Sequence, residues 1–305
     1  MNDQRPASAE TSSKSAYPDI DHVAHFLPDI ETAGVALTEL GFTLTPFSEQ
    51  SHRLTPDGPL VPAGTANRCI MLRRGYLEFL TPTHDTPNAG QLRAAMQHYT
   101  GVHLLAFGTQ NPDADFQRLS AEGFQPLTPL ALQRQVGTVT GETLARFTVV
   151  RVPPQAMAEG RVQYCQHHTR EAVWQPRWLT HANHAAGLAG VILCVADPAE
   201  VARRYARFTG LPVATDNAAG TGNTCRIDTA RGYLLFAAPD WLQNTLGEIP
   251  PALPWIAGYV LDSDNLRETF ARTGGSAFGT RCLVKCSAAL GGLMIFQAAS
   301  SEPLA

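Results

Sequence analysis

The stretch AGTANRC at residues 63–69 recurs as AGTGNTC at residues 219–225. The repeat continues in the same order downstream, where RGYLEF at 74–79 is matched by RGYLLF at 231–236. Two matched blocks at nearly constant separation are hard to produce by chance, and repetition of a structural unit is the usual source of such a pattern. The sequence therefore predicts two structurally equivalent halves.

A shorter plan repeats inside each half. It consists of a strand, a helix and an exit at a glycine, and it is found at residues 21–42, 101–124, 189–211 and 255–275. Each predicted helix has apolar residues at helical spacing and an acidic or Pro-Asp start. Short β-rich runs broken by Gly, Pro and Asn follow each helix. The pattern predicts an α+β fold built from four βαβββ modules.

The bulk composition fits a globular protein with a substantial core. The chain has 305 residues, 44% of them hydrophobic and 16% charged, with a net charge of −4. Because no basic excess or basic run is present, nucleic acid and anionic membranes are not expected partners. No apolar run approaches the ~18 residues of a membrane span. A small molecule is the expected partner, and a homodimer is compatible with these data.

The domain boundaries follow from the repeat. Residues 1–17 are polar and rich in small residues, and we expect a disordered tail there. The first half then covers residues 18–175 and the second half residues 176–305. The start of the chain lacks the apolar segment of a secretory signal, and the six cysteines are scattered, so a cytoplasmic protein is expected.

Several motifs in the first half resemble the vicinal oxygen chelate superfamily. They are DHV at 21–23, LGF at 40–42 and GYLEF at 75–79, and GTAN at 64–67 with YLE at 76–78 resembles its glyoxalase-like branch. The resemblance covers nearly the whole chain after the tail. That superfamily includes glyoxalase I, extradiol dioxygenases, epimerases and antibiotic-sequestering proteins, so the fold does not by itself decide the reaction.

The resemblance implies that each pair of modules forms a U-shaped mixed sheet with its helices outside. It also implies a metal in the trough, held from the first and last strands of each module. In module one these strands offer His22 and Glu78. Aligning Phe107 with Phe26 places His103 of module two at the position of His22.

The fourth expected ligand is Gln166. Aligning YCQ at 164–166 with YLE at 76–78 places Gln166 at the position of Glu78. His167 replaces Gln166 if the strand slips by one residue, because such a slip turns every side chain to the other face. Two imidazoles and a carboxylate suit one divalent ion, which can be Fe, Mn, Zn, Ni or Co, and no other cofactor is expected.

The second half lacks comparable residues. Leu235 stands where Glu78 stands, and Gly190 or Val191 stands where His22 stands. The fourth module offers Trp255 or Ile256 together with Ile295. None of these side chains can coordinate a metal. The second half is therefore expected to be structural or substrate-shaping, and its apolar trough is a candidate place for a ligand.

Residues that recur in both halves are interpreted as structural. Asn67 recurs as Asn223 and Arg74 as Arg231, although the second half has no metal ligands. His52 has no counterpart in the second half. It is a candidate for proton transfer near the metal, with a solvent-exposed position as the alternative.

These residues predict a metal-dependent glyoxalase-like enzyme. Its substrate is expected to be a small organic molecule with neighbouring oxygens, and its reaction an isomerisation or a lyase reaction. Glu78 or His52 would carry the proton. An extradiol-type non-haem iron dioxygenase is one alternative, because two histidines and a carboxylate form its iron site. A non-catalytic binding or resistance protein is the other.

Glu78→Leu copies the second half and tests the difference between the halves. We expect the variant to fold and to lose metal and activity, because Leu235 shows that the equivalent strand accepts leucine. Removing a buried carboxylate also removes its desolvation cost from the metal-free protein. Thermal denaturation in EDTA measures this, and a large loss of stability relative to metal-free wild type would identify Glu78 as a structural residue.

Overall fold

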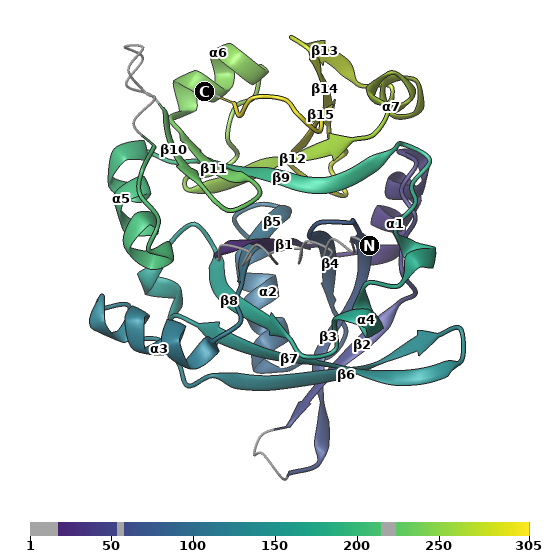
Figure 1. Ribbon diagram of the computed structural model, residues 1–305, viewed down its shortest axis with the longest axis vertical. Coiled ribbons are helices and arrows are strands. Elements are labelled where there is room, and N and C mark those ends of the chain that lie inside the picture. Colours follow the sequence, from purple (N-terminus) through teal and green to yellow (C-terminus); the bar gives the residue numbers. More distant parts are fainter. Residues whose placement is uncertain (1–17, 54–57, 215–223, 305) are drawn as a thin grey trace, which may run out of the picture.

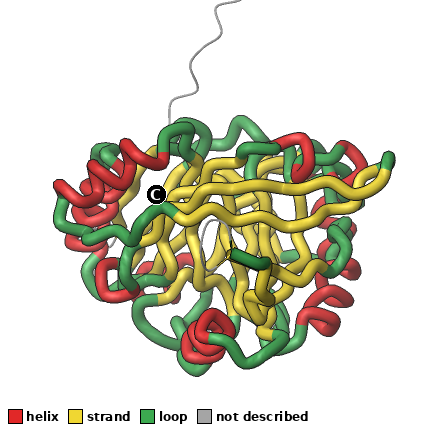
Figure 2. The backbone as a smooth tube through the Cα atoms, turned by 90° about the horizontal axis from the view of Figure 1, so that it is seen from below, coloured by secondary structure: helices red, strands yellow, loops and turns green. Residues whose placement is uncertain are grey.

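A mixed β-sheet with peripheral helices forms the molecule (Figures 1 and 2). The computed structural model describes residues 18–53, 58–214 and 224–304, without the side chains of residues 52, 53 and 60. Fifteen strands and seven α-helices lie in this part of the chain. The predicted tail at residues 1–17 falls outside it. The α+β class is confirmed, and none of the described helices has both the length and the apolar character needed to cross a membrane.

The first half contains eight strands and three helices. Its elements are β1 (Asp19–Phe26), α1 (Ile30–Glu39), β2 (Ser48–Arg53), β3 (Leu60–Met71), β4 (Tyr76–Pro82), α2 (Pro87–Met96), β5 (Gly101–Gly108), α3 (Pro112–Ala121), β6 (Leu130–Thr138), β7 (Gly141–Arg151) and β8 (Arg161–His167).

A connector with the short helix α4 (Arg170–Val173) leads to the second half. Its elements are β9 (Ala185–Cys194), α5 (Pro198–Thr209), β10 (Thr224–Asp228), β11 (Tyr233–Ala237), α6 (Pro239–Leu246), β12 (Trp255–Ser263), α7 (Leu266–Thr273), β13 (Ser276–Phe278), β14 (Arg281–Lys285) and β15 (Leu293–Ala298).

Four helices begin in the same way. The residues that precede α1, α3, α5 and α7 are Asp29, Asn111, Asp197 and Asn265. Each side chain accepts a hydrogen bond from the backbone N–H three residues further on. Such a cap stabilises a helix by about 1 kcal/mol. Local capping residues therefore set the helix starts that the sequence predicted.

The strands of the first half close into a ring. Their order is β1-β4-β3-β2-β6-β7-β8-β5, and β5 returns to pair with β1. The ring closes where Ser51 of β2 lies opposite Gln133 of β6. This differs from the predicted open U, and pairing the two edges satisfies backbone groups that an open sheet would leave bare. A ring of eight strands is wide enough inside to hold one small ligand.

The second half repeats the central pairings of the first. β9 pairs with β11 in parallel and with β12 antiparallel, as β1 pairs with β4 and β5. β12 pairs with β15 in parallel, as β5 pairs with β8. In Figure 1, β9 and β12 cross above the ring, with α6 and β13–β15 on their far side. Strand β12 also meets β5, where Ile256 lies opposite Val102.

Apolar side chains fill the trough of the second half. Leu235 and Ile295, the equivalents of metal-ligand positions, are buried in one cluster with Leu242 and Leu246 of α6. Leu304, close to the end of the chain, belongs to the same cluster. The face that was a candidate place for a ligand is therefore packed core in the described structure.

Two reciprocal ion pairs join the halves. Arg74 of the first half pairs with Asp262 on β12, and Arg231 of the second half pairs with Asp19 on β1. Both arginines precede the Gly-Tyr of the repeated RGYL motif. Gly75, with φ of +73°, lets the turn after Arg74 approach other strands closely. The structural interpretation of these repeated arginines agrees with their contacts.

His25 adds a buried contact between the halves. Its Nδ1–H donates to the carbonyl oxygen of Leu290 at 2.9 Å, and the Tyr259 hydroxyl donates to its Nε2 at 3.1 Å. Burial lowers the pKa of His25 to about 4, although the hydrogen bond to Leu290 opposes the shift. The ring is therefore neutral in the folded protein at neutral pH.

We expect the protein to lose stability as the pH falls from about 6.5 to about 4. In that window the unfolded chain binds a proton at residue 25 that the folded chain resists, and the difference amounts to about 3 kcal/mol. Chemical denaturation at several pH values measures it, with His25→Gln as the comparison. An equally steep acid loss in the variant would show that residue 25 is not responsible.

Candidate metal centre and substrate cavity

A cavity of about 440 Å³ lies within the ring of β1–β8. Its apolar wall includes Leu104, Leu130, Leu132, Phe147 and Val149. Its ionisable side chains are His22, Glu78, Arg134, Arg151, Arg161, Cys165 and Tyr76. Alternation along the strands produces this wall, because every second residue of a strand points to the same face. The cavity thus combines a mainly apolar body with charged groups at defined points.

His22 and Glu78, two of the residues singled out in the sequence, lie side by side on the wall of this cavity. The Nε2 atom of His22 lies 3.9 Å from Oε2 of Glu78. The ring of His22 stacks on the ring of Tyr76, with 4.4 Å between the centroids. The alternation of β4 sends Tyr76 and Glu78 to the same side, so one strand supplies both the carboxylate and the surface that holds the imidazole.

Asp21 orients His22. The Nδ1–H of His22 donates to Oδ2 of Asp21 at 2.6 Å, and the Nε2–H of His167 donates to the same oxygen at 2.9 Å. Burial alone would raise the pKa of Asp21, but the charges and hydrogen bonds of His167 and His22 hold it below its usual value. An ionised Asp21 only accepts, so the Nδ1 atom of His22 carries a proton, and the Nε2 atom is the one turned toward Glu78.

Two amide side chains hold Glu78. Asn67 donates from Nδ2 to Oε1 of Glu78 at 2.5 Å, and Gln50 donates from Nε2 to the same atom at 3.3 Å. The Oδ1 atom of Asn67 is buried without a hydrogen-bond partner among the described residues. Asn67, on β3, therefore contacts the candidate site and does not have a purely structural role, which corrects the interpretation drawn from its repetition. Asn223 falls outside the described residues.

His103 does not join this group. Its Nε2 bonds to the carbonyl oxygen of Tyr99 at 2.8 Å, and its ring lies between those of Tyr99 and Phe26. The register between β1 and β5 shifts here, since Ala24 lies opposite Leu104 and the next pair skips His103. Leu104 takes the place on the cavity wall that the alignment assigned to His103.

Gln166 also points away from the cavity. Its Nε2 donates to the carbonyl oxygen of Gln110 at 3.0 Å, whereas its neighbour Cys165 lines the cavity. His167 is the residue of this pair that reaches the group, through its bond to Asp21. The structure therefore favours the one-residue slip that the sequence left open, although His167 contacts Asp21 rather than Glu78. The side chain of His52 lies outside the described part of the chain.

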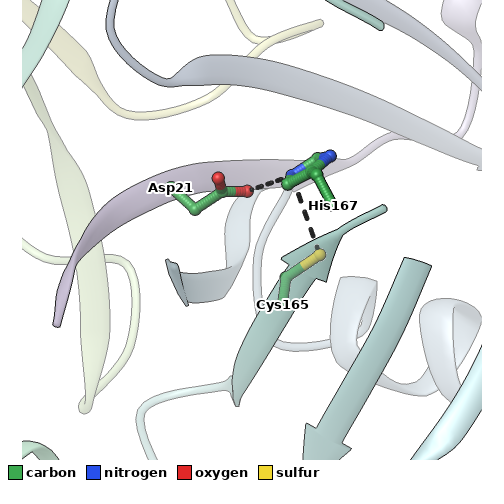
Figure 3. A group of neighbouring side chains, drawn as sticks. All are labelled: Asp21, Cys165 and His167. Atoms are coloured by element: carbon green, nitrogen blue, oxygen red, sulfur yellow. Dashed lines mark hydrogen bonds and ion pairs between the residues drawn. The ribbon is translucent and has the colours of Figure 1, made fainter. Parts of the chain in front are cut away.

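Asp21, Cys165 and His167 form a second group of potential ligands (Figure 3). One ligand atom from each lies within 4.8 Å of the others. Burial raises the pKa of the Cys165 thiol well above its usual value, and the charges of Asp21 and Glu78 add to the effect. The thiol is therefore neutral. Because His167 already donates its proton to Asp21, this group supports His22 through hydrogen bonds.

The equivalent place in the second half is occupied by protein. Gly190 lies opposite Tyr233 as His22 lies opposite Tyr76. A Cβ atom added to Gly190 would lie 2.8 Å from the Tyr233 ring. The tyrosine thus covers the position of the missing imidazole, and buried Leu235 replaces the carboxylate.

Sequence reasoning missed Asp21 and Cys165. A residue next to His22 in a regular strand should face away from it, but the pairing of β1 with β5 skips Asp21 between Ile20 and His22. A bulge of this kind re-aims side chains. In the sequence, the only signal for Asp21 was its position next to His22. A one-residue slip that turns His167 toward the site also turns Cys165 toward it, because the two residues share one face of β8.

The donor set fits a divalent cation. An imidazole nitrogen of His22 and a carboxylate oxygen of Glu78, two atom types that bind divalent cations, lie 3.9 Å apart. A carboxylate behind the imidazole is the usual support of a metal-bound histidine. The unpartnered Oδ1 of Asn67 adds a buried oxygen beside Glu78. The described residues bring together two of the four predicted ligands.

The model of the glyoxalase-like domain family matches residues 20–209. The chain belongs to this family. Its place in the vicinal oxygen chelate superfamily, inferred from motifs, is confirmed. No curated protein matches the chain.

Solved structures share the fold at low identity. A hypothetical protein from Staphylococcus aureus has a TM-score of 0.64 and 10% identity, over 92% of this chain and all of that one. A fusion of a xylose isomerase-like TIM barrel with 4-hydroxyphenylpyruvate dioxygenase has a TM-score of 0.57 and 11% identity, over 99% of this chain and 53% of that one. A mutant 4-hydroxymandelate synthase from Streptomyces coelicolor has a TM-score of 0.53 and 13% identity, over 92% and 93%.

Cys165 should be unreactive in the folded protein. Its raised pKa leaves almost no thiolate at neutral pH, and the thiolate is the form that alkylating reagents attack. We expect iodoacetamide to label Cys165 only after unfolding, as measured by peptide mass spectrometry in native and denatured samples. Rapid labelling of the native protein would contradict a buried neutral thiol at this position.

Proposed function

We propose that the protein is a metal-dependent glyoxalase-like enzyme. Its substrate is a small organic molecule with neighbouring oxygens, and its reaction is an isomerisation or lyase reaction. The pair of His22 Nε2 and Glu78 Oε2, 3.9 Å apart on the wall of the cavity, carries this proposal. His22 and Glu78 would hold one divalent ion, with the buried Oδ1 of Asn67 beside them.

Each residue near the pair has a separate task. The ion, when bound, supplies Lewis acidity toward the neighbouring oxygens of the substrate. Asp21 keeps the proton of His22 on Nδ1, and His167 stabilises the charge of Asp21. Asn67 and Gln50 restrain one oxygen of Glu78, which leaves Oε2 turned toward His22. Glu78 is also the carboxylate placed to accept a substrate proton.

The dioxygenase alternative has less support. The usual iron site of two histidines and one carboxylate requires a second imidazole beside Glu78. His103 lies against Tyr99 instead, and His167 bonds to Asp21. The likeness to the two structures with dioxygenase or synthase names, at 11% and 13% identity, concerns the fold.

We also propose that the chain arose by duplication of a unit with two βαβββ modules. Strands β1–β8 belong to the half at 18–175, and β9–β15 belong to the half at 176–305. The repeated pairings of β9 and β12 support this division. In this proposal the second half supports the ring and does not bind a metal.

Metal content tests the function directly. We expect one divalent ion per chain in anaerobically purified wild type, measured by emission spectroscopy. His22→Ala and Glu78→Ala should each lower the metal content strongly, because each removes one of two facing donors. His103→Ala is the matched control, since it removes an imidazole that lies outside the cavity.

Two results would contradict this assignment. The first is wild-type protein without stoichiometric metal. The second is metal that survives Glu78→Ala but is lost in Cys165→Ala, which would place it at Asp21, Cys165 and His167 instead. Circular dichroism of every variant shows whether a loss of metal reflects a loss of fold.

A further inference from the structure

Three arginines, Arg134, Arg151 and Arg161, line the cavity without an ion pair among the described residues, and the last two lie on neighbouring strands. Arg151 ends β7 and Arg161 begins β8, and neither forms an ion pair among the described residues. Arg151 lies opposite Gln163 in the pairing of these strands, two residues from Arg161. Residues in such diagonal positions have Cα atoms about 7–8 Å apart, so one anionic group can reach both guanidinium groups.

Neutral amides hold both guanidinium groups in place. Arg151 donates from Nε to Oε1 of Gln163 at 3.3 Å. Arg161 donates from Nη2 to Oε1 of Gln91 at 2.8 Å and to Oδ1 of Asn88 at 3.3 Å. These contacts orient the arginines without neutralising their charge, and the remaining N–H groups of Arg151 have no hydrogen-bond partner among the described residues.

Thr65 fixes one of these amides. The Nδ2 of Asn88 donates to the hydroxyl oxygen of Thr65 at 3.2 Å, which turns its Oδ1 toward Arg161. Thr65 itself is almost fully buried. An amide whose two ends are both engaged cannot swing away easily, so the position of Arg161 is built into the wall of the cavity.

Partial burial makes the neighbouring positive charges of Arg151 and Arg161 costly. Burial lowers the pKa of Arg161 to about 10, and the charge of Arg151 contributes to the shift. Burial likewise lowers the pKa of Arg151. Glu78 acts on both arginines through its charge, without a hydrogen bond to either. Both arginines are half-buried, and charges of one sign held close together in such a place are costly unless a counterion is supplied.

The arginines share the cavity with the proposed metal ligands. Along β8 the cavity face runs from Arg161 through Gln163 to Cys165, which lies beside the Asp21 network. Arg161 and Cys165 are four positions apart on this strand, which corresponds to about 13 Å. The apolar side chains of β6 and β7 line the cavity as well, including Leu132 and Phe147.

We propose that Arg151 and Arg161 bind an anionic group of the substrate, a carboxylate or a phosphate ester, in the cavity that also contains His22 and Glu78. The substrate is thus an organic anion with an apolar body, and its reacting oxygens lie toward His22 and Glu78. Guanidinium groups bind both kinds of anion through paired hydrogen bonds. The choice of reacting end rests on the proposed function, whereas the anion site does not.

Calorimetric titration of EDTA-treated protein tests the anion site without the metal. The probes are benzoate, phenyl phosphate and the neutral benzyl alcohol. We expect saturable binding of at least one anion, about tenfold or more tighter than binding of benzyl alcohol, because charged hydrogen bonds contribute that much. The tighter anion identifies the headgroup.

Arg151→Met and Arg161→Met should each weaken binding of that anion by about tenfold or more and leave benzyl alcohol unchanged. Arg161→Lys should retain part of the affinity because it keeps the charge. Arg203→Met is the control, since Arg203 is an exposed arginine on α5 and its loss should have no effect.

The proposal is overturned if neither anion binds wild type saturably, or if a folded double variant of Arg151→Met and Arg161→Met binds the anion as wild type does. Equal affinity for the neutral alcohol overturns it too. Metal content is measured on the same variants and should stay at the wild-type level. Failure of the anion-site proposal is seen in the calorimetric titrations. Failure of the metal-site proposal is seen instead in the metal content of His22→Ala and Glu78→Ala.

Discussion

The buried carboxylate of Asp21 organises the candidate site. It accepts hydrogen bonds from His22 on β1 and His167 on β8, two strands that are separated by β5 in the ring. A buried charge of this kind is tolerated only when its partners are in place, so the two imidazoles and the carboxylate depend on one another. The orientation of His22 toward Glu78, and with it the proposed metal site, follows from this network.

Closure of the ring makes an enclosed site out of that network. The contact between β2 and β6 surrounds the cavity with strands on all sides, and the second half braces the ring from outside through β12 and the ion pairs of Arg74 and Arg231. The two halves share their pairings but differ in content. Where the first half has His22 and Glu78, the second has the Tyr233 ring over Gly190 and a buried leucine.

The sequence placed some residues of the candidate site better than others. The sequence singled out His22 and Glu78 because each stands at a repeated position with a non-ligating counterpart in the other half, and the two side chains lie 3.9 Å apart. His103 and Gln166 were placed by alignments that assume regular strands. One skipped residue turns a side chain to the other face of a strand, and β5 skips one residue at His103. Asp21 was missed for the same reason, because its own bulge turns it toward His167.

The sequence alone determined the repeated motifs, the α+β class, the helix starts and the asymmetry between Glu78 and Leu235, because each rests on residue type and local spacing. The tertiary structure decided the closure of the ring, the meeting of Asp21 with His167 and the shared cavity of Arg151, Arg161 and Glu78. These depend on strand register and on pairing between distant segments. Neither is encoded in any short stretch of the chain, since both are set by how the strands pack against one another.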